Sequence, residues 1–425
     1  MGIMEIGKVP VTRLAEKCGT PLLIYDEEKI ENKIKSYMRN FSSPLFQTEV
    51  VYASKAFGCP AMIEKVKDAG ASLDVVSGGE LYIAKVSGMN MEKVYFHGNN
   101  KTSEEINTAL EFGCGNIVAD NPEEFRTIIE TAACTKRKIN LMLRINPKVA
   151  AHTHEYTVTA AEDSKFGVSI DHKEKIAVLI KTAADKKVTF KGFHSHIGSQ
   201  IFEASAFIKA AGLMIGLCSY MEKEHDIPCP WLSLGGGFGI KYTAEDDPPE
   251  TETLCRELIR GGEEAIRSAG VKTEKIMIEP GRSIAGDAGC TVYKVGYEKI
   301  AGDKRYLFVD GGMGDNIRPA LYGAEYSCDL AEHMGDTKDK EYVIGGKYCE
   351  SGDIIIRKAM LPEAKKGDLL IVYSTGAYAY SMSSCYNGTG RPAVVFVKDG
   401  RARLVMRREK KEDLMYLAKD QEVKI

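Results

Sequence analysis

Short apolar runs alternate with segments of helical periodicity along the first two thirds of the chain. Eight runs stand out from about residue 48 onward, and they cover residues 50–55, 73–76, 94–96, 116–119, 140–146, 190–196, 232–234 and 276–278. The segments between them carry helix signals, as at 121–133, where Asn, Pro and two Glu open the helix. Near-continuous apolar strands separated by helices are typical of a parallel sheet. Eight such units over about 240 residues predict a (β/α)8 barrel of the TIM type, and a doubly wound open sheet is the alternative.

The hydrophobic pattern changes after Glu279. Strand-like runs separated by Gly-Asp turns then follow one another without helices between them, at residues 289–300, 304–312, 341–356, 367–378 and 392–406. This texture predicts an all-β second domain, a small barrel or sandwich, which the strand-like run 21–26 would join. The predicted organisation is a barrel over 31–285 and a β domain built from 1–30 and 286–425.

Composition narrows the class of protein. The 57 basic and 60 acidic residues give a net charge of −3, and no basic tract indicates a nucleic-acid partner. Eleven cysteines without a CxxC pair favour free thiols in a reducing compartment. The first residues lack a signal-peptide pattern, and the longest apolar stretch, 210–218, is too short for a membrane span. We therefore expect a cytoplasmic protein.

Polar residues follow the ends of the predicted barrel strands. They are Lys55, 77–80, 97–99, Asp120, Arg144, 194–200, 235–239 and 279–282. The carboxyl ends of the strands of such a barrel form one rim, where catalytic groups collect. Each residue alone has a structural alternative, since a lysine usually reaches water and a glycine cluster is usually a turn. Their common position favours an active site.

The glycines at 235–237 match neither a dinucleotide fingerprint nor a P-loop. Loops after strands seven and eight of these barrels commonly bind phosphate. A phosphate site together with the amine of Lys55 indicates pyridoxal 5'-phosphate (PLP) held as a Schiff base. Glu279 would then face the ring nitrogen and His194 would stack on the ring, although Glu279 as a helix-terminus acid and His194 as a packing residue are the structural alternatives.

Several short motifs carry a family resemblance. They are "YASKAF", "SGGEL", "GNNK", "HTHEYTVTAAEDSKFG", "HIGSQ", "LGGGFGI", "EPGRSI", "RPALY", "CESGD" and "GAYAYSMSSCYNG". In this order, from about residue 20 to 395, they resemble the diaminopimelate decarboxylases, within the alanine-racemase-like PLP enzymes. The general motifs are shared with ornithine and arginine decarboxylases, whereas "CESGD" and "RPALY" are more specific.

The resemblance implies a cofactor site. Lys55 would carry PLP, with His194 on the ring and Glu279 at the ring nitrogen. The phosphate region and the remaining cofactor contacts would come from Ser199, Gly235, Gly236, Gly237, Gly281, Arg282 and Tyr378. Cys349 and Glu350 would enter the active site from the neighbouring subunit, which implies a homodimer.

The resemblance also implies a reaction, the decarboxylation of meso-2,6-diaminopimelate to L-lysine and CO2 in the last step of lysine biosynthesis. Arg318 and Tyr322, four residues apart, would bind the distal carboxylate of the substrate, because a guanidinium matches a carboxylate in bidentate geometry. Further substrate contacts would come from Arg282, Glu350 and Tyr378. Cys349 would donate the proton that replaces the lost carboxylate.

Alternatives stay open at this point. Arg318 as a surface residue, Tyr322 as a packing residue and Cys349 as a buried small hydrophobe are each compatible with the sequence. A decarboxylase of ornithine, lysine, arginine or carboxynorspermidine type is the alternative function. A racemase of this fold is disfavoured because Glu279 makes the ring a strong electron sink.

Two features do not fit the pattern closely. Phe57 stands where many members of the family have asparagine. His152 and His154 suggest a metal site, but no third ligand is near them in the sequence, so we expect no metal and an active-site loop there.

Overall fold

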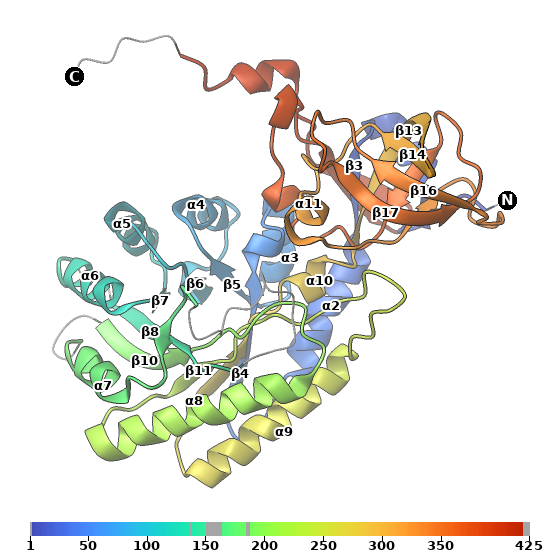
Figure 1. The fold of residues 1–425 in the computed structure, drawn as a ribbon. Coiled ribbons are helices and arrows are strands. Elements are labelled where there is room, and N and C mark those ends of the chain that lie inside the picture. Colours follow the sequence, from blue (N-terminus) through green and yellow to red (C-terminus); the bar gives the residue numbers. More distant parts are fainter. Residues whose placement is uncertain (1, 136–137, 150–163, 184–187, 420–425) are drawn as a thin grey trace. The chain divides into compact units, whose positions relative to one another are not determined.

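The structure is a computed structural model that describes residues 2–135, 138–149, 164–183 and 188–419 (Figure 1). The chain divides into two compact units. The first, called the barrel unit, comprises Glu31–Lys241 and Asp246–Ile284. The second, called the β unit, comprises Met1–Ile30, Tyr242–Glu245 and Ala285–Ile425. His152 and His154 lie outside the described residues.

Eight parallel strands close the barrel. They are β4 (Gln47–Ala53), β5 (Ser72–Val75), β6 (Val94–Phe96), β7 (Asn116–Ala119), β8 (Ile139–Asn146), β10 (Val188–His194), β11 (Trp231–Ser233) and β12 (Lys275–Ile278). Each of these strands pairs in parallel with the next one in this list, and β12 pairs with β4 to close the barrel. The short strand β9 (Val168–Ser169) pairs in parallel with the end of β8. The prediction of a (β/α)8 barrel is thus confirmed, and the open sheet is excluded.

One helix, α2, precedes the first barrel strand, and the other helices follow strands around the barrel (Figure 1). They are α2 (Glu27–Asn40), α3 (Pro60–Asp68), α4 (Gly78–Val86), α5 (Ser103–Phe112), α6 (Pro122–Ala133), α7 (Lys173–Lys181), α8 (Ala204–His225), α9 (Thr251–Ala269) and the short α10 (Arg282–Ala285). Their starts are specified locally. Asn121 caps α6 by accepting the N–H of Glu124, and Thr102 and Glu105 form a capping box on α5. Both arrangements satisfy N–H groups that a helix leaves free at its first turn.

Helix α8 is longer and more apolar than the sequence analysis expects. Its 22 residues reach a mean hydropathy of 1.4 over an 18-residue window, so the expectation from 210–218 alone underestimates the stretch. By length and composition α8 could cross a membrane, but the core helix of a soluble protein passes the same test. Half of that window is buried, and α8 packs along α9 in the barrel unit (Figure 1). Its composition is explained by this packing.

The interior of the barrel is filled toward the amino ends of the strands. Val51, Tyr95, Val118, Met142 and Met277 form a buried cluster there. The carboxylate of Glu49 accepts hydrogen bonds from Ser72, from Tyr95 at 2.9 Å and from Lys275 at 2.6 Å. A filled and fully bonded end leaves the carboxyl ends of the strands for chemistry.

The β unit is built on one large sheet. Its main path runs in the order β17 (Ile354–Leu361), β16 (Lys340–Gly345), β14 (Lys304–Val309), β13 (Gly289–Ala301), β3 (Leu22–Asp26), β19 (Ala393–Lys398) and β20 (Arg401–Met406). Off this path, β18 (Leu369–Val372) pairs with β13 and β15 (Cys328–Leu330). Smaller elements are β1 (Glu5–Ile6), β2 (Val9–Pro10), α1 (Val11–Cys18) and α11 (Arg318–Tyr322). Strand β3 lies in this sheet between β13 and β19.

Candidate active site

The carboxyl ends of the barrel strands bring the predicted polar residues to one rim. Lys55 lies in the single turn Ser54–Ala56 that follows β4, and its side chain is exposed. Asp74 lies within β5 and is buried, and Asp120 and Arg144 come from β7 and β8. The rim is completed by His97, His194, the glycines after β11 and Glu279 after β12.

Lys55 influences two acids of the rim, Asp74 and Glu80. Burial raises the pKa of Asp74 well above its ordinary value, and the charge of Lys55 acts against this rise. Burial also raises the pKa of Glu80, again opposed by Lys55. His196 has its pKa lowered by burial and then by Lys55 and Arg144. Lys55 therefore combines an accessible amine with a polar, partly buried surround.

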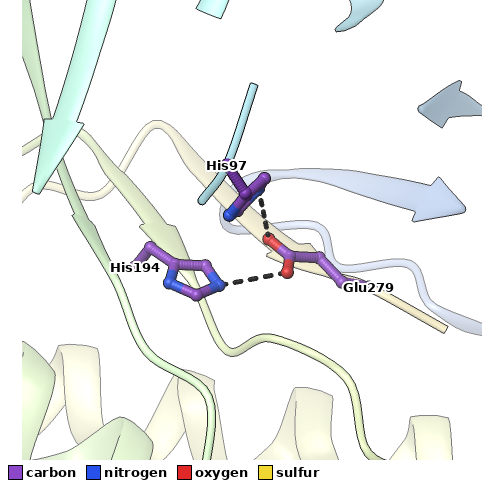
Figure 2. Close-up of side chains that lie close together, drawn as sticks. All are labelled: His97, His194 and Glu279. Atoms are coloured by element: carbon purple, nitrogen blue, oxygen red, sulfur yellow. Dashed lines mark hydrogen bonds and ion pairs between the residues drawn. The ribbon is translucent and has the colours of Figure 1, made fainter. Parts of the chain in front are cut away.

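Glu279 is buried among hydrogen-bond donors (Figure 2). Ser233 donates to its Oε1 at 2.6 Å, and the Nε2 of His194 lies 3.0 Å from Oε2. The Nε2 of His97 lies 3.6 Å from Oε1. Burial alone would raise the pKa of Glu279, but these neighbours bring it well below the ordinary value. The carboxylate is therefore charged at neutral pH, as a partner for a cationic group requires.

The glycines after β11 form a cradle that has no room for side chains. A Cβ on Gly236 would lie 2.0 Å from the carbonyl oxygen of Glu279, and one on Gly237 would lie 2.1 Å from that of Gly198. Gly235 and Gly237 also have positive φ, at 70° and 108°, which favours glycine. A Cβ on Gly281 would lie 2.9 Å from that of Ala53. Bare backbone at this position suits the close approach of an anion.

Arg282 lies beside this cradle, at the start of α10. Its Nη2 donates to the hydroxyl of Ser199 at 2.9 Å. The side chain of Arg282 is buried. A guanidinium next to a glycine cradle supplies the charge that a phosphate needs.

In the β unit, Arg318 is enclosed by aromatic residues. It is 7% exposed, which excludes the surface alternative. Its Nη1 donates to the hydroxyl of Tyr326, and its guanidinium carbon lies 4.9 Å from the ring centroid of Tyr242. Tyr378 adds to the electrostatic environment of Arg318, and Tyr322 is half-buried at the end of the same short helix. The aromatic rings hold the guanidinium by cation–π contacts.

Cys349 and Glu350 lie in the loop between β16 and β17, and both are exposed. The alternative of a buried Cys349 is therefore wrong. Asp353 fixes this loop, because its carboxylate accepts the N–H groups of Met313 at 2.7 Å and Tyr348 at 2.8 Å. The backbone N–H of Cys349 donates to the side chain of Asn387. Both side chains are thus presented to the outside of the β unit.

Comparison with known proteins decides the family. A family model described as "Pyridoxal-dependent decarboxylase, pyridoxal binding domain" matches residues 27–286. Diaminopimelate decarboxylase of Bacillus subtilis is 45% identical over 417 residues, which are 98% of this chain and 95% of the relative. The chain belongs to the diaminopimelate decarboxylases.

Solved structures agree with this membership. Diaminopimelate decarboxylase from M. jannaschii in co-complex with L-lysine matches with a TM-score of 0.90 and 33% identity, over 98% of this chain and 95% of that one. A lysine/ornithine decarboxylase from Vibrio vulnificus, complexed with putrescine, matches with a TM-score of 0.76 over 92% of this chain and 97% of that one. At 23% identity it shows a shared fold alone.

Pyridoxal phosphate is the cofactor of this decarboxylase family, and the rim residues fit it. The rim offers an accessible amine at Lys55, a backbone cradle at 235–237 with Arg282 beside it, and a charged carboxylate at Glu279. Within the described residues, buried polar atoms without a hydrogen-bond partner gather here, among them Oδ1 of Asp74 and Nδ1 of His194. Such atoms are expected where a polar ligand binds.

Three further residues lie at this rim, Asp74, His196 and Ser233, and none of them has a predicted role of its own. Asp74 was visible as the one charged residue in an apolar run, "LDVV". His196 lies two residues after His194, and its Nδ1 accepts the N–H of Gly236 at 3.3 Å. Ser233 gave no signal, because a serine at a strand end is common. Phe57 is buried, and its carbonyl accepts the hydroxyl of Tyr52, so it is a packing residue here.

Two expectations about metals and thiols can also be compared with this structure. All eleven cysteines are free. Among the described residues, His97, His194 and Glu279 offer ligand atoms within 4.8 Å of one another, a spacing that a metal ion could use. Glu279 is the carboxylate that the sequence assigns to the ring nitrogen of PLP. The cluster can therefore bind either a metal ion or the PLP ring, but not both at once.

Proposed function

We propose that this chain decarboxylates meso-2,6-diaminopimelate to L-lysine and CO2, the last step of lysine biosynthesis, in the cytoplasm. The observation that carries the proposal is the rim of the barrel unit, where an exposed Lys55, a glycine cradle and a charged Glu279 meet. The full-length similarity to diaminopimelate decarboxylases supports the choice of substrate. When bound, PLP supplies a sink for the electron pair that the departing carboxylate leaves behind.

The residues of the barrel unit bind and orient this cofactor. Lys55 would hold it covalently through its amine. Ser199, Gly235, Gly236, Gly237, Gly281 and Arg282 would hold the phosphate group. Glu279 would pair with the ring nitrogen and stabilise its proton. Nε2 of His194 lies within hydrogen-bond distance of Glu279, so this ring is oriented toward the carboxylate. His196, which accepts the N–H of Gly236 in the glycine cradle, is therefore the better candidate for the contact on the face of the PLP ring.

The residues of the β unit select the substrate. Arg318, positioned by its tyrosine contacts, binds the distal carboxylate together with Tyr322, and Tyr378 adds a contact. From the barrel unit, Arg282 is proposed as a further substrate contact. Glu350 binds the distal ammonium and Cys349 donates the proton at the reacting carbon, both from the neighbouring subunit of a homodimer. The exposure of Cys349 and Glu350 supports this assignment.

A substrate panel tests the reaction. The purified protein with PLP should release CO2 and lysine from meso-2,6-diaminopimelate and turn over ornithine, lysine, arginine and carboxynorspermidine poorly. Arg318→Ala should abolish most diaminopimelate activity and leave any activity on a simple diamino acid little changed. Absence of turnover, or solvent-deuterium exchange without CO2, would refute the proposal.

A trapping experiment tests the cofactor site. Borohydride reduction should fix PLP on Lys55 in the wild-type protein and not in Lys55→Ala, which should fold normally because Lys55 is exposed. Trapping at another lysine would contradict the assignment.

Subunit mixing tests the shared site. Lys55→Ala and Cys349→Ala should each be inactive, and their mixture should recover about a quarter of wild-type activity, since half of the dimers are mixed and each has one working site. The two variants should exchange subunits, which differently tagged chains would show. Exchange without recovery would place Cys349 in its own subunit's site.

A further inference from the structure

The Glu279 carboxylate is held from two sides by buried histidines (Figure 2). His194 at the end of β10 places Nε2 3.0 Å from Oε2, and His97 after β6 places Nε2 3.6 Å from Oε1. The two imidazole rings pack edge to face, with centroids 4.8 Å apart and an interplanar angle of 69°. His97 is 6% exposed and His194 is 2% exposed. Each ring therefore limits the movement of the other as well as that of Glu279.

His97 also connects Glu279 to the second acid of the site. Its Nε2 lies 4.0 Å from Oδ1 of Asp74, so one imidazole stands between two buried carboxylates. Within the described part of the chain, Nδ1 of His194, Nε2 of His97 and Oδ1 of Asp74 have no hydrogen-bond partner. A histidine kept only for packing normally has both nitrogens satisfied. In both histidines, Nε2 is the nitrogen paired with Glu279.

The surround of Glu279 carries several charges. The titratable and charged groups that face it are Asp74, Tyr95, His97, Arg144, His194 and His196. Donors on a carboxylate oxygen stabilise its charged form and fix its orientation. A charged, fixed carboxylate is what a protonated ring nitrogen requires of its partner.

We propose that His194 and His97 are positioning residues for Glu279, which hold its carboxylate charged and directed at the ring nitrogen of PLP. The inference rests on the proposed function, because it assigns Glu279 to that nitrogen. His194 acts by direct hydrogen bonding, and His97 acts by packing on His194 and by separating Glu279 from Asp74. Neither needs to touch the substrate.

Two amide substitutions separate positioning from packing. In His194→Gln the side-chain amide reaches the position of Nε2 and can donate to Glu279, whereas in His194→Asn it reaches only the position of Nδ1. The control is His225→Ala, which removes another His–Glu pair, His225 Nε2 to Glu174 Oε2 at 3.4 Å, from the exposed side of the barrel unit.

The readouts are the affinity for PLP, the absorption spectrum of bound PLP as a function of pH, and the separate values of kcat and KM. His194→Asn should bind PLP about tenfold more weakly, because a hydrogen bond to a charged group is lost. Its spectrum should change with pH at a different midpoint from wild type, and kcat should fall while KM changes little. His194→Gln should recover most of each effect, and His97→Ala should shift the midpoint in the same direction as His194→Asn.

The outcomes distinguish the inference from the function on which it rests. A wild-type protein that binds no PLP or releases no CO2 would refute the proposed function. A functional wild type with His194→Asn and His194→Gln both indistinguishable from His225→Ala would refute the inference alone. A stoichiometric divalent metal ion in the wild-type protein, lost in His194→Asn with PLP binding unchanged, would also overturn it and assign the cluster to a metal.

Discussion

Lys101 is a second lysine at the rim of the barrel unit, and its environment is the opposite of that of Lys55. Its side chain is 1% exposed. The ammonium donates to the carbonyls of Gly98 at 2.8 Å and Val118 at 2.7 Å, and to Glu124 Oε2 at 3.1 Å. All three N–H donors of the ammonium are thus used. Such a lysine stabilises the fold and takes no part in amine chemistry.

The magnitude of this stabilisation follows from burial. Lys101→Met keeps the aliphatic stem but leaves two carbonyls and the Glu124 carboxylate, itself 5% exposed, with fewer partners. Removal of one member of a buried ion pair costs about 3–5 kcal/mol, because the other charge stays buried and uncompensated. This is a large part of the roughly 5–15 kcal/mol that stabilises a typical domain.

Urea unfolding followed by tryptophan fluorescence measures this cost. Trp231 is the only tryptophan of the chain and lies on β11, so its signal reports the barrel unit. With a denaturant slope of about 3 kcal/mol per molar, Lys101→Met should lower the urea midpoint by about 1–1.7 M. Lys93→Met is the matched control, because Lys93 also donates to a carbonyl, of Gly70, but is exposed. Its effect should stay within about 1 kcal/mol.

A double variant tests whether the lost stability comes from the unpaired Glu124 carboxylate. If the cost arises from the unpaired Glu124 charge, Lys101→Met combined with Glu124→Gln should be more stable than Lys101→Met alone. Glu124→Gln retains an acceptor for the N–H of Asp120, which now donates to Oε2 at 2.7 Å. A Lys101→Met midpoint equal to that of Lys93→Met would show that the buried pair contributes nothing net, and the argument from burial would fail.

Three further predictions follow from the site and from the β unit. Tyr326→Phe should raise KM for meso-2,6-diaminopimelate about tenfold and leave kcat nearly unchanged, because Arg318 loses a hydrogen bond that positions it; equal loss in kcat would contradict a role in binding alone. Burial raises the pKa of Asp315 to about 7, so the folded protein retains a proton that the unfolded chain has released. The stability that protonated Asp315 contributes is present at low pH and is lost as pH rises through about 7. Between pH 5 and pH 8, the free energy of unfolding of Asp315→Asn should therefore fall by about 2.5 kcal/mol less than that of wild type, as measured by thermal unfolding. Gly236→Ala should lower kcat/KM on the order of 100-fold, since the added Cβ displaces the backbone of Glu279, and circular dichroism should show a retained fold.

The barrel was predictable because its strands are buried on both faces. A run such as 116–119 has no polar position to obscure it, and it is followed by Asn121, Pro122 and two acids, which specify the start of α6. The pairing of β3 with β13 and β19 was predictable only as a possibility, because a short apolar run at the start of a chain does not state its partner. Hydrophobic periodicity identifies the strands, but it does not tell which strands far apart in the sequence pair with each other.

The roles of charged residues were harder to predict, because the residue type alone does not tell whether a side chain is buried. Lys55 follows an apolar run and is exposed, whereas Lys101 follows a polar segment, "HGNN", and is buried. Arg318 had a surface alternative that only the packing of Tyr242 and Tyr326 excludes. Tyr242 lies 76 positions before Arg318 in the chain, on a segment that no local pattern connects to it.

Hydrogen-bond satisfaction separates the two ends of the barrel more clearly than residue type does. Near the amino ends of the strands, Glu49 accepts from three side chains, and Lys275 lies 4.0 Å from the ring of Trp231 as well as bonding to Glu49. Near the carboxyl ends, Asp74 and Asp120 each keep a buried oxygen that accepts no hydrogen bond within the described residues. A closed polar network stabilises a fold, while an open one is costly unless a ligand completes it. The same residue types therefore support structure at one end and function at the other, and only the partners that the fold brings to them decide which.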